Sequence, residues 1–130
     1  MSDIEIINTV SRLIEDYFWG WQYENWEQVR GTLSADVRFE DPKLGCFDGI
    51  DTHIDLYANS QRFPNLKGVS PRRVANNQDV GFLSYDVYLG HERVATVMDQ
   101  LTVREGKIVY VLSVMSEWPE GYPDLSNIST

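Results

Sequence analysis

The stretch from residue 93 to residue 117, RVATVMDQLTVREGKIVYVLSVMSE, decides the fold class of this chain. Two long runs rich in β-branched residues flank Glu105-Gly106, a dipeptide short enough for a hairpin turn. Apolar and polar side chains alternate along the first run, as they do on a strand with one buried face. Similar runs precede it, and Gly90-His91 forms a second short turn. The sequence therefore predicts an antiparallel meander of four strands, at residues 68–78, 81–89, 93–104 and 107–117.

The N-terminal half has the period of helices instead. Apolar residues recur every three or four positions from Ile6 to Trp21, and Ser2 with Glu5 has the form of a capping box. A shorter second helix is expected after Asn25, whose side chain can cap its first turn. Helices followed by a meander are typical of the α+β class, which we expect here.

A turn, a strand and a third helix are expected between these two halves. The turn is expected at residues 34–36, and the alternation over residues 37–41 predicts a strand. Pro42 should close that strand, because proline cannot donate to a sheet ladder. A loop of about seven residues should follow. The apolar face of residues 50–57 then predicts the third helix.

Length and charge argue against several classes of protein. At 130 residues the chain fits one domain, expected at residues 1–118, with an irregular tail at residues 119–130. A net charge of −9 argues against nucleic-acid and membrane partners, because both present negative charge. The single cysteine, Cys46, cannot form an internal disulfide, and the acidic N-terminal segment is unlike a signal peptide. We therefore expect a cytoplasmic protein.

Three elements each direct one ionisable side chain toward the predicted core. On the third strand of the meander Asp99 shares a face with apolar residues such as Leu101. Asp41 shares a face with Phe39 on the first strand, and Tyr17 lies on the apolar stripe of the first helix. Each residue also has a structural interpretation. Asp41 can start a turn, as an aspartate directly before a proline commonly does, Asp99 can be paired with an arginine or exposed at a sheet edge, and Tyr17 can be an ordinary core tyrosine.

Together these three groups would form a chemically useful set. A carboxyl buried without donors takes up a proton, because burial penalises its charged form. A protonated carboxyl and a tyrosine hydroxyl can both donate hydrogen bonds to one developing oxyanion. A second, ionised carboxylate nearby can act as a general base. The sequence thus favours acid-base chemistry on an oxygen-bearing ligand.

Four short motifs and the order of the elements resemble the nuclear transport factor 2-like family, and ketosteroid isomerase most closely within it. The motifs are RLIEDY ending at Tyr17, EDP around Asp41, DLY ending at Tyr57 and VMD ending at Asp99. The similarity covers about residues 4–118. It implies N-terminal helices packed on a strongly curved antiparallel or mixed sheet, which forms a cone around an internal apolar pocket.

The resemblance also implies roles for these residues. Asp41 would be the base that moves a proton between two carbons of an unsaturated ketone. Tyr17 and a protonated Asp99 would hold the dienolate oxygen, and Tyr57 would support Tyr17. The resemblance implies no cofactor, an apolar small-molecule ligand with a ketone or other oxygen, and a homodimer formed through the outer face of the meander.

Some positions depart from that pattern and leave other functions open. Leu33 and Met115 stand where some ketosteroid isomerases have a further tyrosine and a pocket aromatic. Relatives similar to limonene-epoxide hydrolase use an Arg-x-Asp pair and an aspartate on the last strand. This chain has Val97-Met98-Asp99 and Ser113 at those places, so the carboxylate-water-carboxylate arrangement of those relatives is missing. SnoaL-like polyketide cyclases and polyether-type epoxide hydrolases are the main alternative, because some rely on a similar acid pair. A non-catalytic small-molecule-binding domain is the third.

The remaining candidates concern the pocket wall. We expect it to be lined by Phe39, His53, Trp21, Met115 and Phe47. His53 is either an auxiliary donor or a structural histidine of the third helix. Cys46 and Phe47 are expected near the mouth, in the loop before that helix. Two histidines without metal-ligand spacing give no support for a metal site.

Overall fold

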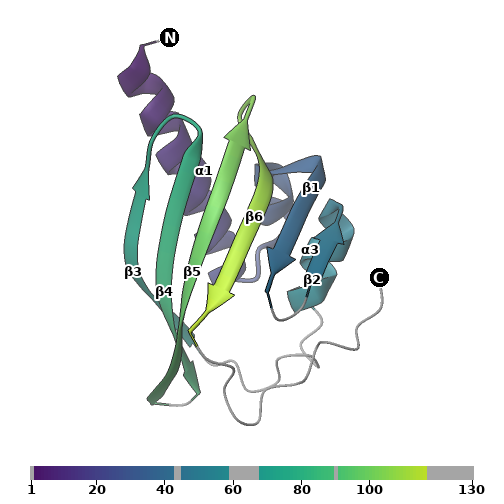
Figure 1. Ribbon diagram of the computed structural model, residues 1–130, viewed down its shortest axis with the longest axis vertical. Coiled ribbons are helices and arrows are strands. Elements are labelled where there is room, and N and C mark those ends of the chain that lie inside the picture. The colour runs from purple at the N-terminus through teal and green to yellow at the C-terminus, as the bar shows by residue number, and fades with distance from the viewer. Residues whose placement is uncertain (1, 43–44, 59–67, 90, 117–130) are drawn as a thin grey trace.

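The computed structural model describes residues 2–42, 45–58, 68–89 and 91–116 of the chain (Figure 1). Its elements in chain order are α1 (Asp3–Gln22), α2 (Trp26–Thr32), β1 (Leu33–Asp41), β2 (Gly45–Asp48), α3 (Ile50–Ala58), β3 (Gly68–Asn76), β4 (Val80–Leu89), β5 (Glu92–Arg104) and β6 (Lys107–Met115). The irregular tail expected at residues 119–130 lies outside the described residues.

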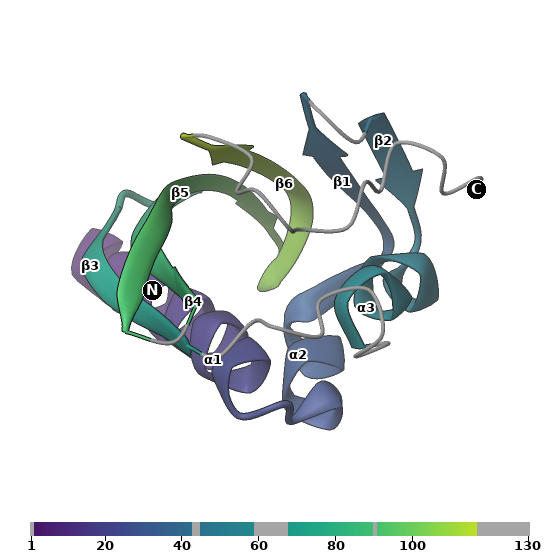
Figure 2. The same ribbon diagram turned by 90° about the horizontal axis from the view of Figure 1, so that it is seen from below.

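One mixed sheet contains all of these strands, in the order β2-β1-β6-β5-β4-β3. The four strands of the C-terminal half form the expected antiparallel meander. β1 joins it through a parallel pairing with β6, and β2 pairs antiparallel with β1. Figure 2 shows the sheet bending through an arc, with the three helices on its inner side. The α+β class and the curved sheet are thus confirmed.

Local signals explain several element boundaries. Ser2 caps α1, since its hydroxyl accepts a hydrogen bond from the Glu5 backbone N–H at 3.2 Å. Asn25 caps α2 in the same way through the Gln28 N–H at 3.2 Å. The β5–β6 turn places Glu105 at φ 51° and Gly106 at φ 75°, the two positive angles of a type I′ hairpin.

Two predictions between the helices and the meander are wrong. Residues 34–36 do not form a turn, because they belong to β1, where an irregularity in the pairing with β6 lies between Leu33 and Arg38. A bulge of this kind keeps a strand continuous through polar residues that break its alternation. The loop expected after Pro42 contains β2, whose four residues are too few to give a periodic signal.

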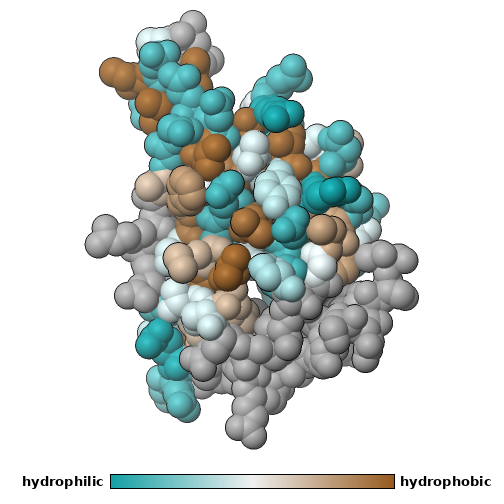
Figure 3. Space-filling model, viewed as in Figure 1, coloured by the Kyte–Doolittle hydropathy of each residue, from teal (hydrophilic) through white to brown (hydrophobic). Residues whose placement is uncertain are grey.

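The outer face of the meander exposes several large apolar side chains. Phe82 on β4, Met98 on β5 and Val114 on β6 are 51%, 60% and 39% exposed. Figure 3 shows this face, where apolar side chains lie between hydrophilic ones. The homodimer expected through this face stays a prediction. In the described ranges no helix combines the length and apolar character needed to cross a membrane.

One close contact between the helices and the sheet lies where α1 packs on the start of β4. Ile14 of α1 is fully buried, and it lies against Gly81 at the start of β4. A Cβ atom at residue 81 would lie 2.9 Å from Ile14 Cγ1 and would overlap Ile14 Cδ1. Asn76 of β3 holds the same region, because it accepts a hydrogen bond from the Ser11 hydroxyl at 2.6 Å and donates one to the Ile7 carbonyl at 3.0 Å. Packing against Ile14 therefore disfavours a side chain at position 81.

We predict that Gly81→Ala lowers the free energy of unfolding by about 1–3 kcal/mol, the usual cost of overpacking a core. Gly31→Ala is the matched control, because a Cβ atom there would meet nothing within 4 Å. Gly31 lies in α2, so its replacement should raise stability by about 0.5–1 kcal/mol through helix propensity. Urea unfolding followed by tryptophan fluorescence measures both. Equal stabilities of the two variants would contradict this account of the α1–β4 contact.

Candidate active site

The three ionisable residues predicted to point inward are all buried. Tyr17 of α1 is 4% exposed, and Asp41 of β1 and Asp99 of β5 are each 6% exposed. The strand alternation therefore indicated the correct face for both aspartates. β6 lies between their two strands, since it pairs with β1 on one side and with β5 on the other. The curved sheet thus brings residues from three distant parts of the chain to one interior.

Electrostatic coupling shows that these groups share the same interior. The charge of Asp99 raises the pKa of Tyr17, and the charge of Asp41 raises the pKa of Asp99. Interactions of this kind act over short distances between groups that little water separates. Tyr17, Asp99 and Asp41 therefore form one electrostatic cluster.

Asp99 lies in an environment that favours its neutral form. Burial raises the pKa of its carboxyl to about 7, and hydrogen bonds from Ser113 and Tyr85 oppose part of that increase. Ser113 is the residue directly opposite Asp99 on β6. Among the residues that the structure describes, none gives a hydrogen-bond partner to Asp99 Oδ1. Within the described residues this oxygen is therefore buried with its hydrogen-bonding capacity unused.

Tyr17 keeps its proton over the physiological pH range. Burial, and then the charge of Asp99, raise the pKa of its hydroxyl well above its usual value, while the neighbouring Trp21 side chain lowers it in part. The Tyr17 Oη atom lies 3.0 Å from Nε2 of His53. The sequence predicted Tyr57 as the support of Tyr17. Because the Tyr57 side chain lies outside the described residues, that pairing stays a prediction.

His53 has a hydrogen-bond partner that sequence reasoning did not identify. It is fully buried on the inner face of α3, and burial lowers the pKa of its imidazole to about 3. The ring is therefore neutral at physiological pH. It packs against the rings of Phe39 and Trp21, at centroid distances of 4.9 and 5.5 Å. Helical periodicity gave its inward direction, but no local signal gave its partner on α1.

The other residues expected in the pocket wall differ in their surroundings. Phe39 and Phe47 are each 2% exposed and pack against each other inside the main core. Trp21 is partly buried against the same core, whereas Met115 packs on a smaller cluster that contains Val87 and Val97. Phe47 belongs to β2 and not to a loop, and its burial corrects the expectation that it lies at a mouth.

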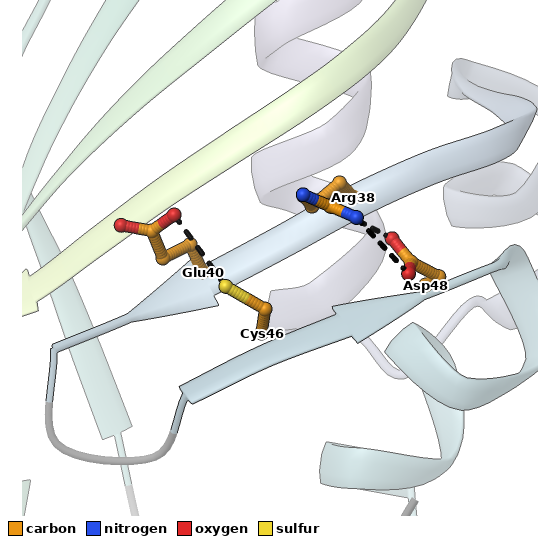
Figure 4. Close-up of polar contacts among 4 residues, drawn as sticks. All are labelled: Arg38, Glu40, Cys46 and Asp48. Carbon is orange, nitrogen blue, oxygen red and sulfur yellow. Dashed lines mark hydrogen bonds and ion pairs between the residues drawn. The ribbon is translucent and has the colours of Figure 1, made fainter.

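Cys46 lies on the opposite face of β2 from Phe47. It is exposed, and its Sγ atom lies 3.5 Å from the Glu40 carboxylate, beside the ion pair of Arg38 and Asp48 (Figure 4). Desolvation and the Glu40 carboxylate raise the pKa of the thiol. A reactive thiolate is therefore disfavoured at Cys46.

Other sites have less support. No group of three or more metal-ligating side chains occurs in the described parts of the chain. A surface groove of about 920 Å³ opens between α1 and the β5–β6 turn, where Val10, Asp36 and Lys107 line it. None of the three buried ionisable residues contacts this groove. The interior cluster of Tyr17, Asp41 and Asp99 is therefore separate from this groove.

Comparisons with known proteins agree with the fold. Residues 14–111 match the family model described as SnoaL-like domain. A candidate ketosteroid isomerase from Kribbella flavida DSM 17836 superposes with a TM-score of 0.76 at 22% identity, over 95% of this chain and 90% of that one. An NTF-2 like protein of unknown function from Burkholderia xenovorans LB400 gives 0.73 at 16% identity, over 92% and 89% of the two chains.

A structure described as a LEH-like epoxide hydrolase from M. tuberculosis gives a TM-score of 0.69 at 18% identity, over 85% of this chain and 84% of that one. No curated protein matches the sequence significantly. At these identities the solved structures show the fold alone. The NTF2-like resemblance inferred from the sequence is thus confirmed as a statement about fold.

The buried Asp99 carboxyl predicts an unusual pH dependence of stability. Its pKa is about 7 in the folded chain, against 3.8 for an unperturbed aspartate. Below pH 3.8 the carboxyl is neutral in both states, and folding carries no cost from it. Between these two values only the unfolded chain is ionised, so the cost grows with pH and is complete above pH 7.

We predict that Asp99→Asn is more stable than wild type above pH 7, by up to about 4 kcal/mol, and that the difference disappears near pH 4. His53 burial affects both proteins equally and cancels in the comparison. Urea unfolding at a series of pH values measures the difference. Asp36→Asn, an exposed aspartate on β1, is the control and should follow wild type at every pH. A difference between Asp99→Asn and wild type that does not vary with pH would contradict the assignment.

Proposed function

The chain belongs to the SnoaL-like domain family, and we propose that within it the protein is a cofactor-free isomerase that moves a proton α to a ketone through a dienolate. The observation that carries this proposal is the unpartnered Oδ1 atom of Asp99, which is buried beside Tyr17 and Asp41 within the described part of the chain. A carboxyl that favours its neutral form in such a place can donate a hydrogen bond to a substrate oxygen.

The proposed reaction assigns one role to each group. The Asp41 carboxylate removes a proton from the carbon between the ketone and a β,γ double bond, and the electron pair of that C–H bond moves into a dienolate. The Tyr17 hydroxyl and the protonated Asp99 carboxyl donate hydrogen bonds to the dienolate oxygen. Protonated Asp41 then returns the same proton to the γ carbon, which gives the conjugated ketone. No atom is gained or lost.

The different states of the two aspartates follow from their surroundings. Burial and the neighbouring Asp41 charge both oppose ionisation of the Asp99 carboxyl. We therefore assign the proton of the pair to Asp99. Ionisation of both carboxyls would place two negative charges beside a developing oxyanion. A neutral Asp99 avoids that repulsion and leaves Asp41 as the base.

Opening or cyclisation of an epoxide is the second candidate, and the coupling between Asp41 and Asp99 favours it. A protonated Asp99 would then donate to the epoxide oxygen while Asp41 activates a nucleophile. The epoxide hydrolase from M. tuberculosis has a similar fold. This chain has Ser113 opposite Asp99, where relatives similar to limonene-epoxide hydrolase have an aspartate, so this candidate reaction would rely on Asp41 and Asp99 alone. If the protein turns over epoxides or polyketides but does not convert unsaturated ketosteroids, that result would favour this candidate over the isomerase. Binding of a phenolic steroid without any turnover would indicate a binding module.

We predict that wild type converts a β,γ-unsaturated 3-ketosteroid to its conjugated isomer, and ultraviolet absorbance measures this conversion. Asp41→Asn should lower kcat by at least about 100-fold, because it removes the general base and preserves the shape of the side chain. Asp36→Asn, on the same strand but exposed, is the matched control and should retain wild-type kcat. An inert wild type, or an Asp41→Asn variant as active as wild type, would exclude the isomerase.

We also predict that kcat/KM falls as the pH rises through about 7. Asp99, whose pKa is about 7, then loses the proton with which it binds the oxyanion. Above that pH, kcat/KM should fall about tenfold for each further pH unit. The amide of Asp99→Asn donates at every pH in this range. The variant should therefore be less active than wild type at pH 6, but without the decline above pH 7. Persistence of the same decline in Asp99→Asn would assign it to another group.

A further inference from the structure

The hydrogen bond between Tyr17 and His53 links two elements at the centre of the interior. Tyr17 extends from α1 and His53 from α3, and their Oη and Nε2 atoms are 3.0 Å apart. The backbone N–H of His53 bonds the Gly49 carbonyl at 3.1 Å, so the first turn of α3 fixes the origin of the imidazole. His53 is fully buried and Tyr17 is 4% exposed. Water therefore does not compete for this contact.

Only one proton can lie between these two atoms, and its position determines what Tyr17 can do. A neutral imidazole has one N–H donor and one bare nitrogen, and a tyrosine hydroxyl has one proton and two lone pairs. If Tyr17 donates to Nε2, the His53 proton is on Nδ1 and the tyrosine has no donor left for a ligand. If Nε2–H donates to Tyr17, the hydroxyl proton is free to point elsewhere.

The surroundings of Nδ1 distinguish these two arrangements. Within residues 2–42, 45–58, 68–89 and 91–116, Nδ1 of His53 is buried and has no hydrogen-bond partner. The ring packs between Phe39 and Trp21. A buried N–H without an acceptor carries the full cost of desolvating a donor, and such orphaned donors are rare in folded proteins. The bare nitrogen is therefore the one at Nδ1, and the proton lies on Nε2.

We propose that His53 is a positioning residue, whose Nε2–H donates to Tyr17 Oη and thereby directs the tyrosine's hydroxyl proton at the substrate oxygen. This inference rests on the proposed function, since it assigns the free proton of Tyr17 to the dienolate. His53 does not contact the substrate in this arrangement and does not take part in the proton transfer. It determines which way the Tyr17 donor points before the substrate binds.

The arrangement suits a site where negative charge develops. Trp21, one turn after Tyr17 on α1, packs in a T-shaped arrangement with the tyrosine ring at a centroid distance of 6.0 Å, and it lowers the pKa of the Tyr17 hydroxyl in part. Burial alone perturbs the His53 pKa, and it keeps the ring neutral. A neutral donor orients Tyr17 without adding a positive charge that would trap an enolate.

The position of the His53 proton can be measured in the free protein. The chain has two histidines, buried His53 and exposed His91, so a ¹⁵N-histidine-labelled sample gives two sets of ring signals. His91→Gln assigns them by removing one set. We expect the remaining ring to be protonated at Nε2 and bare at Nδ1, without change between pH 5 and pH 8. Protonation at Nδ1, or at both nitrogens, would overturn the proposal without any assay of activity.

Kinetics of the ketosteroid reaction test what the hydrogen bond does. His53→Phe keeps an aromatic ring but removes the donor, and His53→Gln retains an N–H that can reach Tyr17. We expect His53→Phe to lower kcat by about 10-fold with KM within twofold, less than the ~100-fold that loss of an oxyanion donor itself causes. His53→Gln should recover most of that loss, and His91→Gln should behave as wild type. Equal kcat for His53→Phe and wild type, or equal losses in His53→Phe and His53→Gln, would refute the positioning role.

Failure of this proposal and failure of the proposed function are separable. A wild-type protein inert toward ketosteroids excludes the isomerase. The affinity for a phenolic steroid, measured by calorimetry, then replaces turnover as the readout of the test. We expect His53→Phe to bind this steroid about 10-fold more weakly than His53→Gln. Equal affinities of the two variants would overturn the inference about His53. An Nε2–H tautomer together with the expected order of affinities would support it whatever the reaction.

Discussion

The parallel pairing of β1 with β6 is the constraint on which the interior of this protein depends. Half of the chain separates the two strands, yet Glu40 pairs with Leu112 and Leu33 with Ile108. A parallel pairing cannot be closed by a hairpin and needs a long connection, which here contains α3 and the first three strands of the meander. The result is that Asp41 and Asp99 lie on either side of one strand. Among the described strands only this pairing joins β1 to the meander, so it brings Asp41 into the sheet that carries Asp99.

The sequence predicted those parts of the site that depend on a single element. Alternation along one strand is enough to place Asp99 among Val97 and Leu101, and the helical stripe is enough to bury Tyr17. The same reasoning placed His53 on the inner face of α3. The family resemblance added the roles, since no spacing by itself distinguishes a catalytic aspartate from a structural one.

The features that were missed are those that arise between elements. β2 has four residues, and only its pairing with β1 makes it a strand. The contact of Tyr17 with His53 depends on the angle at which α1 and α3 meet on the curved sheet, and residues 36 positions apart carry no local signal of it. Long-range pairing sets these relations through packing and burial, which a periodic pattern does not encode.

Burial shifts the pKa values of His53 and Asp99 in opposite directions, and these shifts determine how many protons the chain takes up or releases on folding. Unfolded His53 binds a proton below about pH 6.5, whereas the folded ring stays neutral down to about pH 3, so folding releases a proton between these values. Unfolded Asp99 is ionised above pH 3.8, whereas the folded carboxyl holds its proton up to about pH 7, so folding takes one up. Over the mildly acidic range where the two windows overlap, the exchanges cancel. Folding then transfers one proton from an imidazole to a carboxyl, and the interior becomes uncharged at these two positions without net exchange with the solvent.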